Sequence, residues 1–346
     1  MSSSRALFVP FALALCATEA NAYESDPLSA RRDPPADATI VANAHATEML
    51  SGALDRVNAA TQCNGDDHEM HLAVAKEISR TMTENRTVPS RGRQPQMWFG
   101  AYAAWLEEGP IERMDFRDRT DVYSEVRTGN SAILHVFGPA STIQLAGVLL
   151  GTDKIDHFWV QGYDYFRVSK DGVEPERAVR WGTRSELGIW GEATTGVFSY
   201  ADLAANYDGY QFYATLLSPT SSVQRDDEGC VRMVRPFDWS DWVDWHYDEA
   251  LNPSVFTEGI AQDVERWTTS KGNGICSDDA VWQTAWTSVE NTAHTRDGYY
   301  VSAKAPSRDV QTDLTDLCPS LALAVANEPA TDDALVVSPR AGKKRL

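Results

Sequence analysis

After residue 22 the chain has no hydrophobic run long enough to cross a bilayer. A membrane-spanning helix needs about 20 apolar residues, so we expect no transmembrane segment there. The apolar stretch 6–17 is also too short, but it follows Arg5 and precedes Ala-Asn-Ala at 20–22, which is the layout of a secretory signal. We therefore expect cleavage after residue 22 and an exported mature chain, periplasmic or extracellular. Lipid attachment at Cys16 is the less favoured alternative.

Basic residues are scarce in this sequence. The 346 residues include 31 Lys and Arg against 50 Asp and Glu, which gives a formal net charge of −19. Because such a chain repels phosphate backbones and anionic lipid surfaces, its composition argues against a nucleic-acid partner. The charge is compatible with a divalent cation as cofactor but requires none, and the composition leaves the oligomeric state open.

The familiar catalytic signatures are missing. The sequence contains no G-x-S-x-G, H-E-x-x-H, P-loop or dinucleotide-binding pattern, and no cysteine pair has the C-x-x-C spacing of a zinc or redox site. Four of the five cysteines follow the predicted cleavage position, and an even number in an exported chain favours two disulfides. Three pairings of these four are open: Cys63, Cys230, Cys276 and Cys318.

The spacing of apolar residues predicts a mainly α, bundle-like single domain over 23–325, stapled by disulfides. We expect an extended arm at 23–39, a loop at 85–95, and a disordered tail at 326–346. A small β-hairpin is predicted from 131–137 and 141–150, on either side of Gly138-Pro139-Ala140. The predicted helices are 40–62, 68–84, 153–168, 183–195, 199–217 and 236–252. A short helix or apolar segment is expected at 96–108 and an amphipathic segment at 254–268.

Within the predicted core at 151–217, polar residues recur at helical spacing on two helices. Residues three or four apart share one helix face, so each set forms a stripe. Burying such groups is costly unless they satisfy one another or hold a ligand, so the two stripes predict a polar site inside an apolar bundle. The first stripe is Asp153, His157 and Gln161, and the second is Ser199, Asp202, Asn206 and Gly209.

These residues also carry a resemblance to a known family. The pattern Asp153-Lys154-x-x-His157-Phe158, followed by Ser199-x-x-Asp202-x-x-Ala205-Asn206-x-x-Gly209, resembles the motif of VanZ-like proteins and of the YfiM-type envelope lipoproteins of bacteria. In that motif a Glu lies between the two blocks, and Glu186 or Glu192 stands there in this sequence. The resemblance covers residues 151–210 and implies an association with the cell envelope. It implies no particular reaction, and VanZ-like proteins differ in spanning the membrane several times.

The stripes allow three interpretations. In an acid/base site, His157 is the proton carrier, Asp153 orients it, and Asp202 with Asn206 holds a substrate or ion. In a metal site, His157 and two carboxylates, with Glu186 as a candidate, hold a divalent cation. In a structural network, Lys154 or Arg184 pairs with Asp202, and Ser199 only caps its helix. Further candidate binding residues are Lys154, Ser199, Asp248 and Glu249.

Three other features have two interpretations each. Trp239, Trp242 and Trp245, three apart, are interpreted as a core face rather than a sugar-stacking strip. His68 and His71 are interpreted as surface residues rather than a metal pair. Gly209 is interpreted as a point of close helix approach.

The sequence thus predicts an exported cell-envelope or extracellular protein. Its buried Asp/His/Asp/Asn site would bind, and could hydrolyse, a lipid- or glycan-derived envelope component or another small molecule. The alternative is a non-catalytic structural or adaptor protein in which the same residues form a stabilising network.

Overall fold

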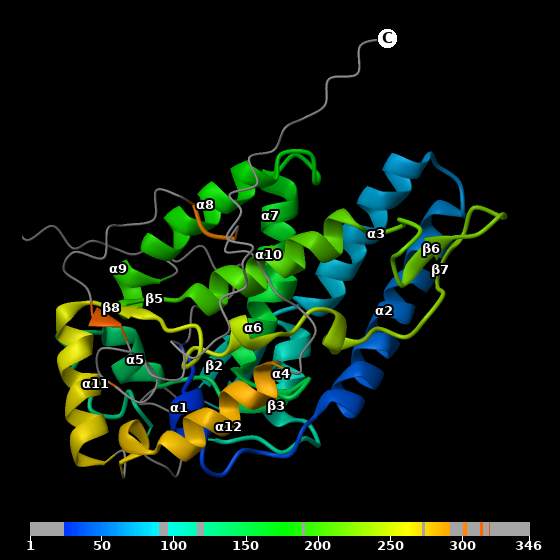
Figure 1. Cartoon of the computed structure of the whole chain (residues 1–346). Helices are drawn as coiled ribbons and strands as arrows, with labels where there is room; N and C mark the ends of the chain where they lie inside the picture. Colours follow the sequence, from blue (N-terminus) through cyan, green and yellow to red (C-terminus); the bar gives the residue numbers. More distant parts are fainter. Residues whose placement is uncertain are drawn as a thin grey trace, which may run out of the picture.

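The computed structural model (Figure 1) describes residues 24–89, 96–115, 121–188, 191–271, 274–290, 300–302, 312–313 and 318. The predicted signal at 1–22 and the predicted tail at 326–346 lie outside the described residues.

The fold is mainly α, as predicted. Its helices are α1 (Pro27–Ala30), α2 (Thr39–Thr61), α3 (Asp67–Met82), α4 (Ala101–Glu108), α5 (Ala132–Phe137), α6 (Thr152–Asp156), α7 (Gly162–Val168), α8 (Pro175–Leu187), α9 (Glu192–Thr195), α10 (Tyr200–Ala214), α11 (Glu258–Ser270) and α12 (Asp279–Glu290). A π-helical turn, η1 (His157–Gln161), joins α6 to α7. The 3-10 turns are η2 (Trp239–Asp241), η3 (Trp245–Tyr247) and η4 (Ile275–Ser277).

The strands are short and antiparallel. Three hairpins pair β1 (Arg86–Pro89) with β2 (Gln96–Phe99), β3 (Thr142–Leu145) with β4 (Val148–Gly151), and β6 (Val223–Arg225) with β7 (Val231–Met233). A three-stranded sheet has the order β5 (Val197–Phe198), β8 (Val255–Phe256) and β9 (Thr312–Asp313). No helix in the described ranges has the length and apolar character needed to cross a membrane.

Helix α10 runs through the middle of the molecule and packs against η1 and α7, whereas α2 and α3 form a pair at one side (Figure 1). The close crossing depends on two glycines, because a Cβ at Gly209 would lie 1.9 Å from the carbonyl oxygen of Phe158 and 2.9 Å from the Cα of Gly162. Gly209 is therefore a point of close helix approach, as predicted.

Aromatic residues fill the space around this crossing. Phe158, Trp159, Phe212 and Trp239 pack edge-on or tilted, with ring centroids 4.8–5.8 Å apart. Trp239 is completely buried, so its interpretation as a core residue is confirmed. This cluster surrounds the segment that carries His157 and keeps it away from solvent.

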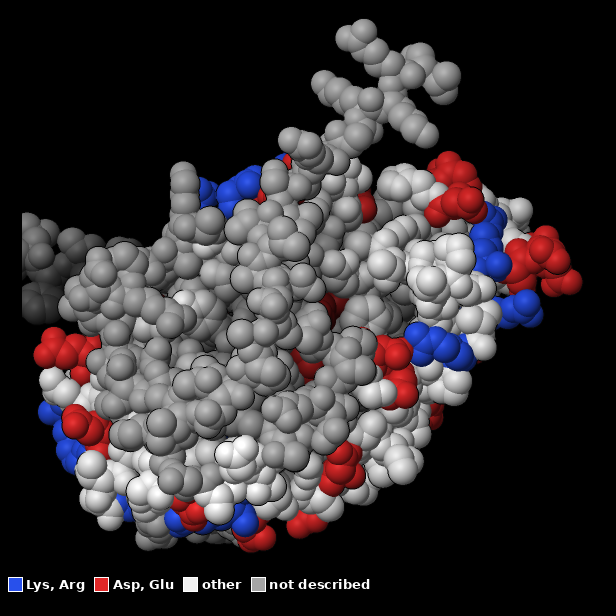
Figure 2. All heavy atoms as spheres, in the orientation of Figure 1, with Lys and Arg blue, Asp and Glu red and all other residues white. Residues whose placement is uncertain are grey.

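Two disulfides join distant parts of the chain. Cys63, just after α2, bonds Cys230, just before β7, and Cys276 in η4 bonds Cys318. The structure thus selects one of the three pairings, and both bonds are compatible with an oxidising compartment. On the face shown in Figure 2, acidic side chains lie in separate patches with basic ones between them.

Several predicted elements were wrong. Residues 24–28 of the predicted arm are buried, and α1 forms there because the Asp26 carboxylate caps it by accepting from the Ser29 N–H. Residues 131–137 contain α5 rather than a strand, since Ser131 caps its start. The hairpin lies within 142–151, where Ala146 and Gly147 adopt positive φ.

The predicted Trp-rich helix at 236–252 is also absent. Asp238 and Asp244 accept hydrogen bonds from backbone N–H groups two residues ahead, which favours short 3-10 turns over a continuous helix. The predicted loop at 85–95 contains β1, and the short helix or apolar segment expected at 96–108 is a strand followed by α4. The predicted helix at 183–195 is the end of α8, which starts at Pro175, followed by α9.

The predicted surface pair separates in the structure. His68 is exposed, but His71 is half-buried and its Nε2 lies 2.7 Å from the carbonyl oxygen of Tyr213. The two histidines therefore do not face one site. The interpretation as surface residues holds for His68 but not for His71, which is half-buried.

Gly209→Ala should destabilise the fold by about 3 kcal/mol, because the added methyl would meet a backbone carbonyl that cannot move independently. Urea denaturation measures the change. Gly129→Ala is the matched control, since a Cβ there meets nothing within 4 Å. Equal stability of the two variants would show that the helix crossing tolerates a wider spacing.

Candidate functional site

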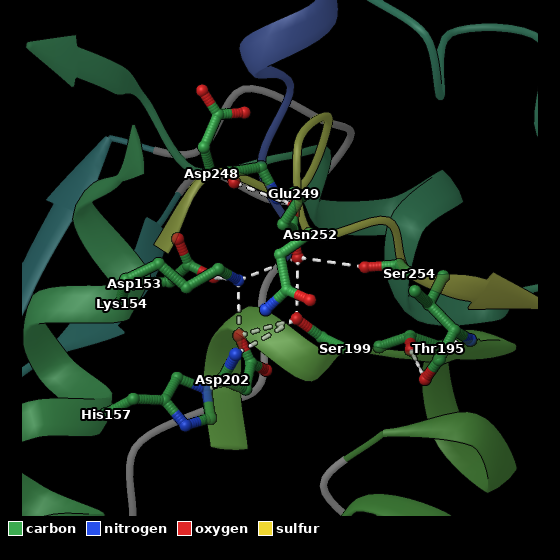
Figure 3. A network of polar contacts seen from close by, with 12 residues as sticks. Asp153, Lys154, His157, Thr195, Ser199, Asp202, Asp248, Glu249, Asn252 and Ser254 are labelled. Carbon is green, nitrogen blue, oxygen red and sulfur yellow. Dashed lines mark hydrogen bonds and ion pairs between the residues drawn. The ribbon is translucent and has the colours of Figure 1, made fainter. Parts of the chain in front are cut away.

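A buried ammonium group lies at the meeting point of three segments (Figure 3). Lys154 of α6 is completely buried, and its Nζ lies 2.7 Å from Asp153 Oδ2 and 2.8 Å from Glu249 Oε1. It also forms an ion pair with Asp202 Oδ1 of α10. Together with His157, these residues are called the ionic centre below. Each of the five is at most 4% exposed.

The His157 imidazole is held between two side chains of α10. Its Nδ1 lies 3.0 Å from Asn206 Oδ1, and the Asn206 amide in turn donates to Gln161 Oε1 at 3.1 Å. With Oδ1 as its partner, Nδ1 must carry a proton. Its Nε2 lies 3.1 Å from Asp202 Oδ2, but the angles do not fit a hydrogen bond. The two predicted stripes therefore meet.

Ser199 connects the start of α10 to the ionic centre. Its Oγ caps the helix by accepting from the Asp202 N–H at 3.1 Å, as predicted. The same Oγ lies 3.0 Å from Asp202 Oδ1 and 2.9 Å from Glu249 Oε1, and its single hydrogen can serve one of them at a time. The backbone N–H of Ser199 donates to Glu186 Oε1 at 2.8 Å, so Glu186 stabilises the start of α10 through Ser199.

The sequence analysis missed the N-terminal segment. Glu249 Oε2 accepts from both the N–H and the Oγ of Ser25, at 3.1 Å and 2.8 Å. The neighbouring Glu24 is completely buried, and within the described part of the chain neither of its carboxylate oxygens has a hydrogen-bond partner. No local pattern marks these residues, because the turn-rich composition around them is typical of an exposed arm.

Asp248 does not join the ionic centre. Its carboxylate points away from Lys154 (Figure 3) and pairs with Arg31 Nη2 at 2.5 Å. Adjacent residues thus face opposite ways, since Glu249 points into the centre. Lys154, and not the exposed Arg184, is the cation that pairs with Asp202.

Burial and charge act in opposite directions on the ionic centre. Burial would lower the pKa of Lys154 and of His157, but neighbouring carboxylates outweigh it and raise both pKa values. Burial would raise the pKa of Asp202, but the charges of His157 and Lys154 outweigh it and hold this pKa well below its usual range. The arrangement therefore favours two protonated bases beside an ionised Asp202.

The pKa values of the remaining acids are shifted mainly by burial. Burial raises the pKa of Asp153 to about 7, with Lys154 opposing the shift and Asp202 reinforcing it. Burial also raises the pKa of Glu24 and of Glu186 well above the usual value, and nearby carboxylates add to both shifts. For Glu24 and Glu186, burial and nearby carboxylates therefore both favour the neutral acid.

Asp153, His157 and Asp202 could hold a metal ion, because one ligand atom from each lies within 4.8 Å of the others. One imidazole nitrogen and two carboxylate oxygens are a suitable donor set for a divalent cation. The Lys154 ammonium contacts both carboxylates, however, and would compete with a cation for the same oxygen atoms.

Comparison with family models, curated proteins and solved structures finds no significant match to this chain. The resemblance of residues 151–210 to the VanZ-like motif stays a prediction. What can be said of the site depends on its geometry.

A buried acid outside the ionic centre gives a test of the electrostatics. Burial and the charge of Asp26 raise the pKa of Asp121 to about 7, whereas an unfolded Asp titrates near about 3.9. Between these values the folded state binds the extra proton, so stability falls as pH rises. We expect a lower free energy of unfolding at pH 8 than at pH 5, and Asp121→Asn should remove on the order of 2 kcal/mol of that fall.

Urea denaturation at the two pH values measures this effect. Asp55→Asn, at an exposed position of α2, is the control and should leave the fall unchanged. If Asp121→Asn retains the full pH dependence, burial of Asp121 is not its source.

Proposed function

We propose that the ionic centre is a stabilising network that fastens together the distant segments of an exported envelope or extracellular protein. The observation that carries this proposal is the position of Lys154, whose ammonium bridges carboxylates of α6, α10 and the turn after η3. Export is supported by the secretory-signal layout and the two disulfides. The envelope association is supported by the resemblance of residues 151–210.

Several contacts of the network join segments that are far apart in sequence. Glu249 connects Lys154 to Ser25, which lies 224 residues away from Glu249, and also receives Ser199. A group of ions with so many fixed partners specifies one arrangement of the chain, since any other would leave buried charges without partners.

Burial favours this function over catalysis in the conformation described. A general base must come within hydrogen-bond reach of a substrate proton, directly or through one water. Here His157 and Asp202 are each 1% exposed, and each already faces the other. His157 and Asp202 are therefore paired with each other without a substrate.

Replacing Lys154 by Met should lower the free energy of unfolding by about 4 kcal/mol, because three carboxylates would lose their shared cation. Lys170→Met is the matched control: its pair with Glu174 is exposed, and its loss should change stability by less than about 0.5 kcal/mol. Urea denaturation of both variants gives the comparison. Unchanged stability of Lys154→Met would refute a stabilising role.

A second candidate function is cation binding with acid/base chemistry. Among the described residues, Asp153 Oδ1 has no hydrogen-bond partner, and His157 Nε2 has only the poorly aligned Asp202 carboxylate, so each could face a bound ion. Such unsatisfied groups in a folded protein call for an explanation, and an ion is one.

Metal analysis of the purified protein tests the second candidate. If the site holds a cation, stoichiometric Zn, Mn or Ca should be found in the parent chain and in His68→Gln, and should be lost in His157→Gln. The exposed His68 makes this a matched control. A metal-free parent protein that also takes up none of these ions on dialysis would leave the stabilising network as the function of the centre.

A further inference from the structure

A cavity of about 580 Å³ lies on the other side of the Asp248–Glu249 pair from the ionic centre. Its walls come from four separate parts of the chain: residues 31–34 after α1, the β3–β4 hairpin, the turn at 248–251, and the start of α12. The volume is that of a typical small-molecule site. It is built, moreover, by segments that the fold brings together from opposite ends of the sequence.

One wall of the cavity is polar and balanced in charge. Arg31 Nη2 lies 2.5 Å from Asp248 Oδ2, with side-chain exposures of 7% and 1%, and Arg32 Nη2 lies 3.0 Å from Asp278 Oδ2 at the open side. The Arg31 guanidinium is also placed 5.5 Å from the ring centroid of Trp282. Asp248 and Trp282 hold the Arg31 guanidinium in place, and among the described residues its buried Nε–H has no acceptor.

The other wall of the cavity is aliphatic. It would receive an apolar group of modest size without any polar contact. The residues that form it are Val148, Leu149, Leu251, Val281 and Ala285.

The two walls together restrict the ligand. An anion would approach Asp248 and Asp278, and a cation would approach Arg31 and Arg32, so neither gains net attraction. A hydroxyl group can accept from a guanidinium N–H and donate to a carboxylate in the same place. We propose that this cavity binds an uncharged ligand that carries sugar-like hydroxyls on one part and an alkyl chain on the other.

This proposal does not depend on the function of the ionic centre. Asp248 in the cavity is adjacent in sequence to Glu249, which pairs with Lys154. A ligand that binds Asp248 should therefore also stabilise the turn that contains Glu249. Octyl β-D-glucoside, below its micellar concentration, is the probe. Octyl sulfate, octyltrimethylammonium and free glucose separate the contributions of charge, hydroxyls and chain.

Calorimetric titration and thermal melting of the full mature chain give the readouts. We expect saturable binding of octyl glucoside, weaker binding of both charged octyl compounds, and little binding of glucose. Arg31→Lys keeps a cation opposite Asp248 but removes the planar guanidinium, and should weaken glucoside binding by about tenfold, the equivalent of one hydrogen bond. In Val281→Trp the larger indole side chain would extend from α12 into the aliphatic part of the cavity, and it should abolish binding.

Arg266→Lys is the matched control, because its pair with Asp263 lies outside the cavity. It should bind the glucoside as the parent does. Thermal melting of every variant verifies that it is folded. If Arg31→Lys does not fold, Val281→Trp still tests the proposal. Absent binding, equal binding by Val281→Trp, or tighter binding of either charged octyl compound would overturn the proposal.

Discussion

The structure depends on one buried ammonium group, that of Lys154, and on the carboxylates around it. Removing an ion from water is costly, and the cost is offset only when oppositely charged partners are held at contact distance. Asp153, Asp202 and Glu249 meet this condition in three separate segments. The arrangement of α6, α10 and the turn after η3 is therefore fixed by electrostatics as well as by packing.

Close backbone packing makes this electrostatic arrangement achievable. Gly162 and Gly209 let α10 approach the π-helical turn so closely that neither position has room for a side chain. The approach places His157 within 3.1 Å of Asp202, whereas a wider crossing would admit water and separate them. The aromatic cluster around Trp239 then covers the same segment, so apolar packing supplies the low-polarity surroundings that strengthen the ion pairs.

Acidic and basic side chains are paired both in the ionic centre and in the cavity beside it. In the ionic centre Lys154 and His157 face three carboxyl groups. Around it, burial raises the pKa of Glu24 and of Glu186, which favours their neutral forms. In the cavity beside it, Arg31 and Arg32 each have an acidic partner. The adjacent residues Asp248 and Glu249 face these two regions from one turn, which couples them mechanically.

Local spacing was sufficient to identify most of the ionic centre. Side chains three or four residues apart share a helix face whatever the rest of the chain does, so the stripes that contain Asp153, His157 and Asp202 could be recognised from the sequence. Helices α2, α3 and α10 were predictable as well, because apolar or polar residues recur three or four apart along each of them. Elements decided by a cap or a turn were not predictable: α5, for example, starts where Ser131 Oγ accepts a hydrogen bond from the Leu134 N–H.

The tertiary structure alone decided which remote residues complete the site. Glu24 and Ser25 have the composition of an exposed arm, and only the folded chain places them against Glu249. The opposite orientations of Asp248 and Glu249, and the choice among the cysteine pairings, likewise depend on contacts between distant segments. The sequence by itself determined which side chains share a helix face, because that follows from backbone geometry within a few residues. Which faces meet is a property of the whole packed chain.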